Sequence, residues 1–260
     1  MKDISYKAFS LRAHRNNLKL ERPNLCQFEL TYRCNLHCNY CYTDCYNTAT
    51  HIKNELGTKE IKAVIDTLYE AGILWLCLSG GEPLLRRDFF EIYAYAHKKG
   101  FLISVFTNGY SIGKEAIRCF KEMPPFVVEI PLSAVSESVY ARVTGVKDSF
   151  EKVIAAITRS IKEGIPLKIK TLVTQDNLQE LPKIKEFAKK IKAAHYFSAI
   201  VQPRLNGDTF PCGLRVPVDE ALYLYDTCMP ENACARNPAQ ERTASLFTCT
   251  VESADGITVD

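Results

Sequence analysis

The stretch that decides the fold covers residues 73–106 and reads ILWLCLSGGEPLLRRDFFEIYAYAHKKGFLISVF. It contains two apolar runs of strand length, residues 73–79 and 101–106, both rich in β-branched and aromatic residues. Between them a helical pattern extends from Asp88 to Gly100. A strand, a helix and a second strand in this order predict two parallel strands joined by a right-handed crossover.

The same alternation continues on both sides of this stretch. Further runs of strand length lie at residues 26–31, 126–132, 166–173 and 195–201. Helical patterns lie at 58–72, at 114–121, from Asp148 (with Glu151 at capping-box spacing) to Gly164, and from Asn177 onward. About six βα units predict an α/β fold of parallel strands, either a partial (β/α)6 barrel, which we adopt, or an open doubly wound sheet. In both, ligands bind at the carboxyl ends of the strands.

Composition divides the chain into three parts. Residues 1–25 form a short N-terminal segment, and residues 26–202 carry the strand and helix alternation of a core domain. Residues 203–260 are rich in Pro, Gly and Cys, with one clear helix at 218–227. We therefore expect an irregular, cysteine-containing C-terminal extension after the core.

Composition and charge exclude several classes of protein. The 260 residues are 47% hydrophobic and 24% charged, which is typical of a globular protein and not of a disordered one. A net charge of +3 is too small to indicate nucleic acid or an anionic membrane as the main partner. No apolar run is long enough to span a bilayer, and the start of the chain lacks the pattern of a signal peptide. These features predict a soluble cytoplasmic protein.

The 11 cysteines, in a chain without an export signal, predict reduced thiols that bind metal rather than a disulfide framework. Cys34, Cys38 and Cys41 form a CxxxCxxC triplet after the first strand, and three such thiolates can wrap one soft metal centre. Structural zinc and most 4Fe-4S clusters take four ligands, so three would leave one iron of a cluster open for a substrate. Cys45 could close the site, although we interpret it as a plain loop thiol. Cys26, Cys77 and Cys119 lie in apolar elements and are interpreted as buried small hydrophobes.

Polar loops containing glycine follow the next two strands. Gly80, Gly81 and Glu82 come after the second strand, where glycines let a backbone approach a ligand and the carboxylate can pair with an ammonium group. Thr107 and Asn108 come after the third strand and present a hydroxyl and an amide at the same rim. Three successive strands therefore end in loops suited to a binding site.

At these residues the sequence resembles the radical S-adenosylmethionine (SAM) enzymes. Their signature is CxxxC, one residue, an aromatic residue and then Cys, which Cys34, Cys38, Tyr40 and Cys41 match without deviation. The glycine-glutamate and Thr-Asn-Gly loops also follow in the order of that family. The resemblance covers about residues 24–201.

The resemblance implies a 4Fe-4S cluster held by Cys34, Cys38 and Cys41, whose open iron chelates the amino and carboxylate groups of SAM. It also implies the remaining contacts to SAM: Tyr40 beside the adenine, the backbone of Gly80 and Gly81 with the Glu82 carboxylate on the methionine ammonium, and Thr107 with Asn108 on the ribose side.

The fourth and fifth strands fit the family pattern less closely. Relatives often have a serine where Pro131 stands, and Ser133 is the substitute we assign to the SAM carboxylate or ribose. Lys168 and Lys170 share one face of the fifth strand by their spacing of two. A solvated pair at the rim is the favoured interpretation, and contact with a carboxylate in the site is the alternative.

The activity implied by the resemblance is reductive cleavage of SAM. A low-potential electron donor of the flavodoxin or ferredoxin type would reduce the cluster, and the resulting 5′-deoxyadenosyl radical would abstract hydrogen from a substrate. A covered barrel mouth would exclude solvent and competing hydrogen donors.

The tail carries a second resemblance, to the SPASM-type extension of radical SAM enzymes that modify peptides or proteins. It rests on residues 212–217, a helix, and Cys249 near the end of the chain. An auxiliary iron–sulfur cluster is implied if the full extension is present, and we expect that the chain is truncated before the remaining cysteines. Cys212, Cys228 and Cys234 are interpreted as unliganded thiols.

The tail resemblance predicts a peptide or protein substrate and a maturase function. Maturation of a tetrapyrrole or another small cofactor by the same radical chemistry is the alternative among enzymes. A non-catalytic zinc or iron–sulfur binding module is the alternative from another class.

Overall fold

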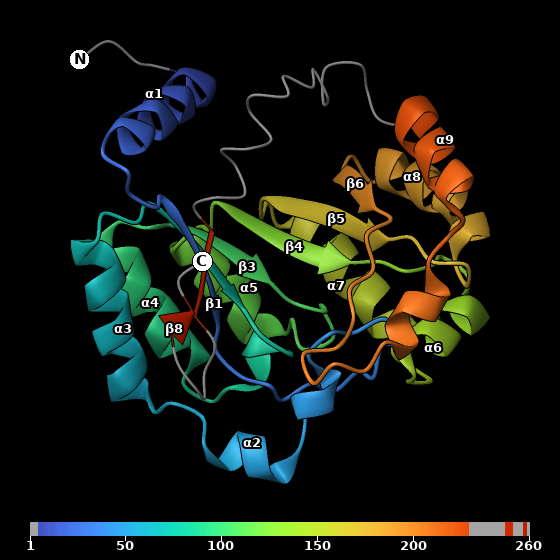
Figure 1. Ribbon diagram of the computed structural model, residues 1–260, viewed down its shortest axis with the longest axis horizontal. Coiled ribbons are helices and arrows are strands. Elements are labelled where there is room, and N and C mark those ends of the chain that lie inside the picture. Colours follow the sequence, from blue (N-terminus) through green and yellow to red (C-terminus); the bar gives the residue numbers. More distant parts are fainter. Residues whose placement is uncertain (1–4, 229–247, 252–256, 259–260) are drawn as a thin grey trace.

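The computed structural model describes residues 5–228, 248–251 and 257–258 (Figure 1). Its centre is a sheet in the order β6-β5-β4-β3-β2-β1-β7-β8, in which each neighbouring pair from β1 to β6 is parallel. The six parallel strands are β1 (Leu25–Glu29), β2 (Trp75–Ser79), β3 (Leu102–Phe106), β4 (Val127–Pro131), β5 (Leu167–Leu172) and β6 (Ala194–Ser198). The prediction of an α/β fold with a partial barrel of parallel strands is confirmed.

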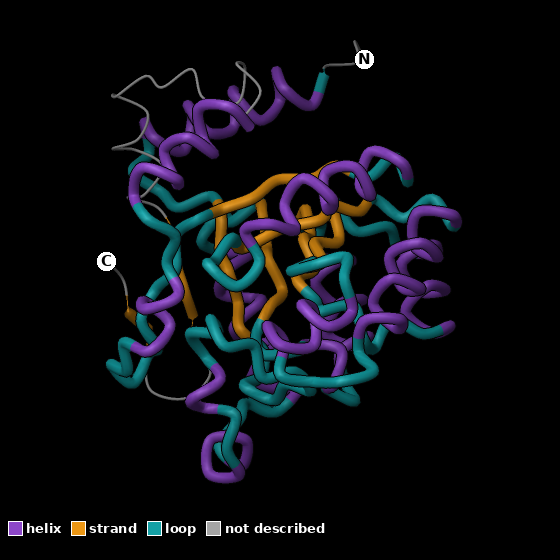
Figure 2. The backbone as a smooth tube through the Cα atoms, turned by 90° about the vertical axis from the view of Figure 1, so that its right-hand side faces the viewer, coloured by secondary structure: helices purple, strands orange, loops and turns teal. Residues whose placement is uncertain are grey.

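Helices pack around the strands, which occupy the middle of the molecule (Figure 2). They are α3 (Thr58–Glu70), α4 (Phe89–Lys99), α5 (Lys114–Glu122), α6 (Glu137–Thr144), α7 (Phe150–Lys162) and α8 (Leu181–Lys190). The α4 helix ends where the sequence predicts, because Gly100 adopts a left-handed conformation with φ of 89°.

The start of α7 was predicted wrongly, and the helix predicted from Asn177 begins as the 3-10 helix Leu178–Glu180 before α8. The α7 helix has Ser149 as its N-cap, and Asp148 lies outside the helix with φ of 61°, so the capping box of Asp148 and Glu151 does not form. The Ser149 hydroxyl donates to the Val146 carbonyl over 2.8 Å instead of capping the helix. Spacing alone could not separate two adjacent residues that both favour caps.

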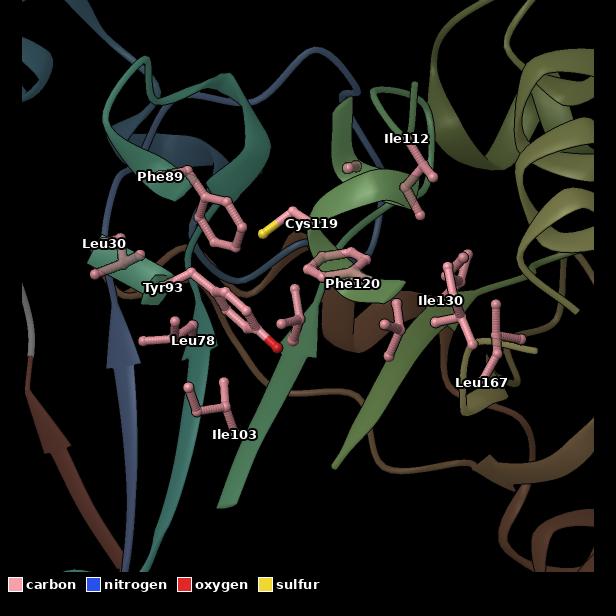
Figure 3. Close-up of a cluster of buried hydrophobic side chains, with 14 of the residues drawn as sticks. Leu30, Leu78, Phe89, Tyr93, Ile103, Ile112, Cys119, Phe120, Ile130 and Leu167 are labelled. Atoms are coloured by element: carbon pink, nitrogen blue, oxygen red, sulfur yellow. The ribbon is translucent and has the colours of Figure 1, made fainter. Parts of the chain in front are cut away.

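The main core lies between the outer face of the strands and the helices (Figure 3). Phe89 and Tyr93 of α4 and Phe120 of α5 pack over Leu78 and Ile103 of the strands. All five are at most 1% exposed, and burial of each such side chain stabilises the fold by about 1.5–3 kcal/mol. Cys26, Cys77 and Cys119 are buried, as predicted. Apolar residues thus occupy the outer face of the strands, which leaves the inner face free for polar residues.

The remaining elements are α1 (Tyr6–Lys19), α2 (Ala49–Lys53), α9 (Val218–Cys228), β7 (Thr248–Val251), β8 (Ile257–Thr258) and the short 3-10 helices Asp44–Tyr46, Pro83–Leu85, Leu178–Glu180 and Phe210–Leu214. A second small core joins Leu224 of α9 and Val216 to Leu181 of α8 and Phe197 of β6. The β7 strand pairs in parallel with β1 and antiparallel with β8. Cys234 and the side chains of Cys228 and Cys249 lie outside the described residues.

None of the described helices is both long and apolar enough to cross a membrane.

Candidate active site

The three cysteines of the triplet line one cavity at the carboxyl ends of the strands. The cavity has a volume of about 780 Å³, and Cys34, Cys38 and Cys41 contribute to its wall. Tyr40, Gly80, Gly81, Thr107, Asn108 and Ser133 line the same cavity. Glu82 is the one predicted site residue whose side chain does not line it within the described part of the chain.

The loop that carries the triplet is anchored at its start by a buried carboxylate. Glu55, whose side chain is 4% exposed, accepts hydrogen bonds from the Thr31 hydroxyl, the Tyr32 amide and the Arg33 guanidinium. The Arg86 guanidinium lies 3.7 Å from the same carboxylate and donates to the Leu30 carbonyl at the end of β1. This network fixes the backbone that leads into Cys34, and nothing in the spacing of these residues predicted it.

The two glycines after β2 are required by the loop itself. The Gly81 amide donates to the Thr31 carbonyl over 2.7 Å, and the Glu82 amide donates to the Arg33 carbonyl over 2.7 Å. A Cβ atom on Gly81 would lie 2.5 Å from the Arg33 carbonyl oxygen. The glycines therefore permit a close approach, as the sequence indicates, and the backbone that approaches is that of the cysteine loop.

The middle of the cysteine loop is held by α6. The His37 amide donates to the Thr144 carbonyl over 2.9 Å, and the Asn39 amide donates to the Val143 carbonyl over 3.0 Å. Gly145 caps α6 with φ of 71°, and a Cβ atom there would lie 2.8 Å from the His37 carbonyl oxygen. The loop is thus held on both sides of Cys38.

Glu82 turns away from the cavity and joins the second and third strand-end loops. Its carboxylate is fully buried and accepts hydrogen bonds from the Thr107 hydroxyl (2.8 Å), the Asn108 amide (2.6 Å) and the Leu84 amide (3.0 Å). Burial raises the pKa of Glu82 to about 7, and the three hydrogen bonds oppose that shift. The Glu82 carboxylate therefore accepts its hydrogen bonds from donors of the protein itself.

Asn108 and Tyr40 connect other parts of the cavity wall. The Asn108 side-chain amide donates to Asn35 Oδ1 over 2.7 Å and lies 3.8 Å from the Cys34 sulfur. The hydroxyl groups of Tyr40 and Ser133 are hydrogen bonded over 3.1 Å. Tyr40 and Ser133, 93 residues apart, are thereby brought together beside the triplet.

The donor set fits a cationic iron–sulfur centre. Burial raises the pKa of Cys34 to about 12 and that of Cys38 well above its usual value, so these thiols ionise only when a positive centre stabilises the thiolates. Among the described residues no three ligating side chains converge on a single-ion position. Cysteine thiolates are the ligands that 4Fe-4S clusters take.

Cys45 lies in the 3-10 helix Asp44–Tyr46, and its sulfur donates to the Tyr42 carbonyl over 3.6 Å. It is not among the described residues that line the cavity. This placement agrees with the interpretation of Cys45 as a plain loop thiol.

Charged residues on the inner face of the strands were missed from the sequence. The Tyr42 hydroxyl donates to Glu29 on β1, and the Tyr196 hydroxyl donates to Glu129 on β4. The two carboxylates and Tyr42 line the cavity together with Lys170. The available signal was a Glu inside an apolar strand run, at positions that alternate with the residues of the main core.

The comparisons with known proteins agree with this site. A family model described as the Radical SAM superfamily matches residues 28–188. The chain belongs to the radical SAM superfamily. Within that superfamily it is 32% identical over 186 residues to the AdoMet-dependent heme synthase of Methanosarcina barkeri (strain Fusaro / DSM 804), covering 72% of this chain and 53% of the relative. It is 30% identical over 174 residues to the PqqA peptide cyclase of Rhizobium meliloti (strain 1021), covering 67% and 46%.

The fold of this radical SAM protein is also that of solved structures. Crystal structures of SuiB from Streptococcus suis superpose with a TM-score of 0.66 at 15% identity, covering 97% of this chain and 56% of SuiB. The form of SuiB bound to its precursor peptide SuiA gives 0.63 at 16% identity, covering 97% and 55%. The chain spans about half the length of the curated relatives it matches.

Proposed function

We propose that this protein is a radical SAM enzyme that abstracts hydrogen from a peptide or protein substrate. The observation that carries the proposal is the shared cavity, in which the cysteine triplet meets the loops after β2 and β3. The core would comprise residues 26–202, and residues 203–260 would form the extension.

Cys34, Cys38 and Cys41 would hold a 4Fe-4S cluster, and its open iron would bind SAM. When bound and reduced by a low-potential donor, the cluster and SAM together supply a 5′-deoxyadenosyl radical for hydrogen abstraction. The chain orients the three thiolates through Glu55 and through the α6 contacts to His37 and Asn39. The three cysteines are half-buried, which limits the access of water to their sulfurs.

The SAM contacts divide into direct and supporting ones. The backbone of Gly80 and Gly81 would receive the methionine ammonium, Tyr40 would lie beside the adenine, and Asn108 and Ser133 would face the ribose and carboxylate. Glu82 and Thr107 hydrogen bond to one another and would hold these loops in place.

The substrate class is supported by relatives. The PqqA peptide cyclase acts on a peptide by name, and SuiB is bound to a precursor peptide in one of its structures. A second candidate, a tetrapyrrole substrate, is supported by the identity to a heme synthase.

Detection of 5′-deoxyadenosine tests the proposed reaction. The protein is reconstituted anaerobically with iron and sulfide, reduced with dithionite and supplied with SAM, and the nucleoside is separated by chromatography. We expect nucleoside from the wild type and from Cys45→Ala, and none from Cys38→Ala. One equivalent of zinc without nucleoside in the wild type, or loss of the nucleoside in Cys45→Ala, would contradict the proposal.

A further inference from the structure

Lys170 places an ammonium group in the wall of the cavity. It lies on β5, in register with Pro131 on β4 and Tyr196 on β6. Its side chain is half-buried and lines the cavity that contains the cysteine triplet. Lys168 lies on the same face of β5 two residues earlier, and it does not line the cavity in the described part of the chain. Of the two lysines, Lys170 is the one nearer the carboxyl end of β5, where the cavity lies.

Two aromatic rings hold the ammonium group of Lys170. Its Nζ lies 5.4 Å from the centroid of the Phe106 ring and 5.7 Å from that of the Tyr196 ring. Such contacts restrain a lysine without neutralising its charge. Phe106 is the residue before Thr107 and Asn108, so the ammonium lies next to the proposed SAM site.

The cavity carboxylates already have other partners. Glu129 accepts a hydrogen bond from the Tyr196 hydroxyl, and Glu29 accepts one from Tyr42 and one from Gln27 Nε2 over 3.4 Å. Burial raises the pKa of Tyr196 above its usual range, so this tyrosine remains a neutral donor. Within the described residues no carboxylate forms an ion pair with Lys170. Lys170 is thus a cation in the cavity wall that two aromatic rings restrain.

We propose that Lys170 binds a carboxylate within this cavity and that the substrate supplies it. This inference rests on the proposed function and names its substrate class, which is a molecule with a carboxylate near the carbon that loses hydrogen. In a peptide, that group is an acidic side chain or the C-terminal carboxylate. A half-buried lysine pairs with a carboxylate through a charge-assisted hydrogen bond, and it repels an ammonium group.

The carboxylate of SAM is the other group of the same chemistry that could reach Lys170, so the experiment separates the two. The reconstituted enzyme is saturated with SAM, and binding of 3-phenylpropionate, its amide and 3-phenylpropylamine is measured by saturation-transfer NMR. The same measurements are made on Lys170→Met, Lys170→Arg and the matched control Lys168→Met. The affinity for SAM alone is measured by equilibrium dialysis for each protein.

We expect the wild type to bind the acid at least about tenfold more tightly than the amide or the amine, because a hydrogen bond between two charged groups is stronger than one to a neutral group. Lys170→Met should lose that preference, Lys170→Arg should retain it, and Lys168→Met should match the wild type. The affinity of every variant for SAM should stay within about twofold of that of the wild type, because under this proposal SAM does not contact Lys170.

Equal binding of the acid and the amine, no binding of the acid at millimolar concentration, or unchanged binding in Lys170→Met would overturn the inference. A loss of SAM affinity in Lys170→Met with acid binding intact would assign the lysine to SAM and overturn the substrate as the source. Neither binding measurement needs turnover. If the nucleoside assay yields no 5′-deoxyadenosine, that result contradicts the proposed reaction. The role of Lys170 is still decided by the binding measurements alone.

Discussion

Single residues decide how closely the loops of the site can approach. Gly81 is in contact with the backbone of Arg33, and Gly145 is in contact with that of His37, so both glycines face the cysteine loop. Other glycines, such as Gly213 in the 3-10 helix Phe210–Leu214, have open space where a Cβ would stand. The sequence alone does not distinguish these glycines from one another. Only their contacts in the structure show which of them a larger residue could not replace.

Gly81→Ala should destabilise the protein by about 1–3 kcal/mol, because the new Cβ would meet backbone oxygens 2.5 and 2.7 Å away that cannot rotate aside. Urea denaturation measures the free energy of unfolding. The matched control Gly213→Ala should change it by about 0.5 kcal/mol or less. Equal effects of the two substitutions would show that the close approach at Gly81 does not matter for stability.

Elements act by covering or leaving open the ends of the strands. The α1 helix has no fully buried residue, yet it packs rings against the start of β2. Trp75 Nε1 donates to the Tyr6 hydroxyl over 3.1 Å, and the Tyr6 ring lies 5.0 Å from that of Phe126. Trp75 is only 7% exposed as a result. This contact covers the ends of the strands opposite the cysteine triplet.

Tyr6→Ala should shift the fluorescence of Trp75, the one tryptophan of the chain, to longer wavelength. The substitution removes the hydrogen-bond acceptor of the indole and a ring contact, together about 1–2 kcal/mol of docking free energy. Emission spectra of the folded protein measure the shift. Leu11→Ala, on the same helix with the leucine 46% exposed, is the control that should leave the spectrum unchanged. An unshifted spectrum in Tyr6→Ala would mean that α1 is held by other contacts.

For the whole molecule, stability depends on buried ionisable groups with opposite pH dependence. Burial, reinforced by the charge of Lys185, lowers the pKa of His195 to about 4. The Thr171 hydroxyl donates to the Leu132 carbonyl and so accepts from His195 Nε2, which places a proton on that ring nitrogen. Glu82, with its pKa raised to about 7, lowers stability as the pH rises from about 4.5 to 7.

The pH dependence of His195 can be isolated by comparing the wild type with His195→Gln. Below about pH 6.5 the unfolded chain takes up a proton that the folded chain does not, so the contribution of His195 to the free energy of unfolding falls as the pH drops from 6.5 towards 4. Urea denaturation at pH 5 and pH 7.5 should therefore show a larger loss on acidification in the wild type than in the variant. Equal losses would mean that the histidine titrates normally in the folded state.

Local sequence determined most of the fold and the chemical identity of the site. The six strands, the main crossover helices and the CxxxCxxC triplet depend on residue type and short-range spacing. Both can be read from the local sequence without any tertiary contact. The same holds for the glycine turn after β2 and for Thr107 and Asn108, whose loops meet because parallel strands end at one edge.

Only the tertiary structure decided which side chains meet inside the sheet. Tyr196 reaches Glu129 across 67 residues of sequence, Glu55 reaches Arg33 across 22, and Glu82 turns to Thr107 rather than to the cavity. It also separated Lys170 from Lys168, which the period of the strand makes equivalent. The physical reason is that periodicity gives the face of a strand, whereas the order, register and curvature of the sheet determine which residues on that face come into contact.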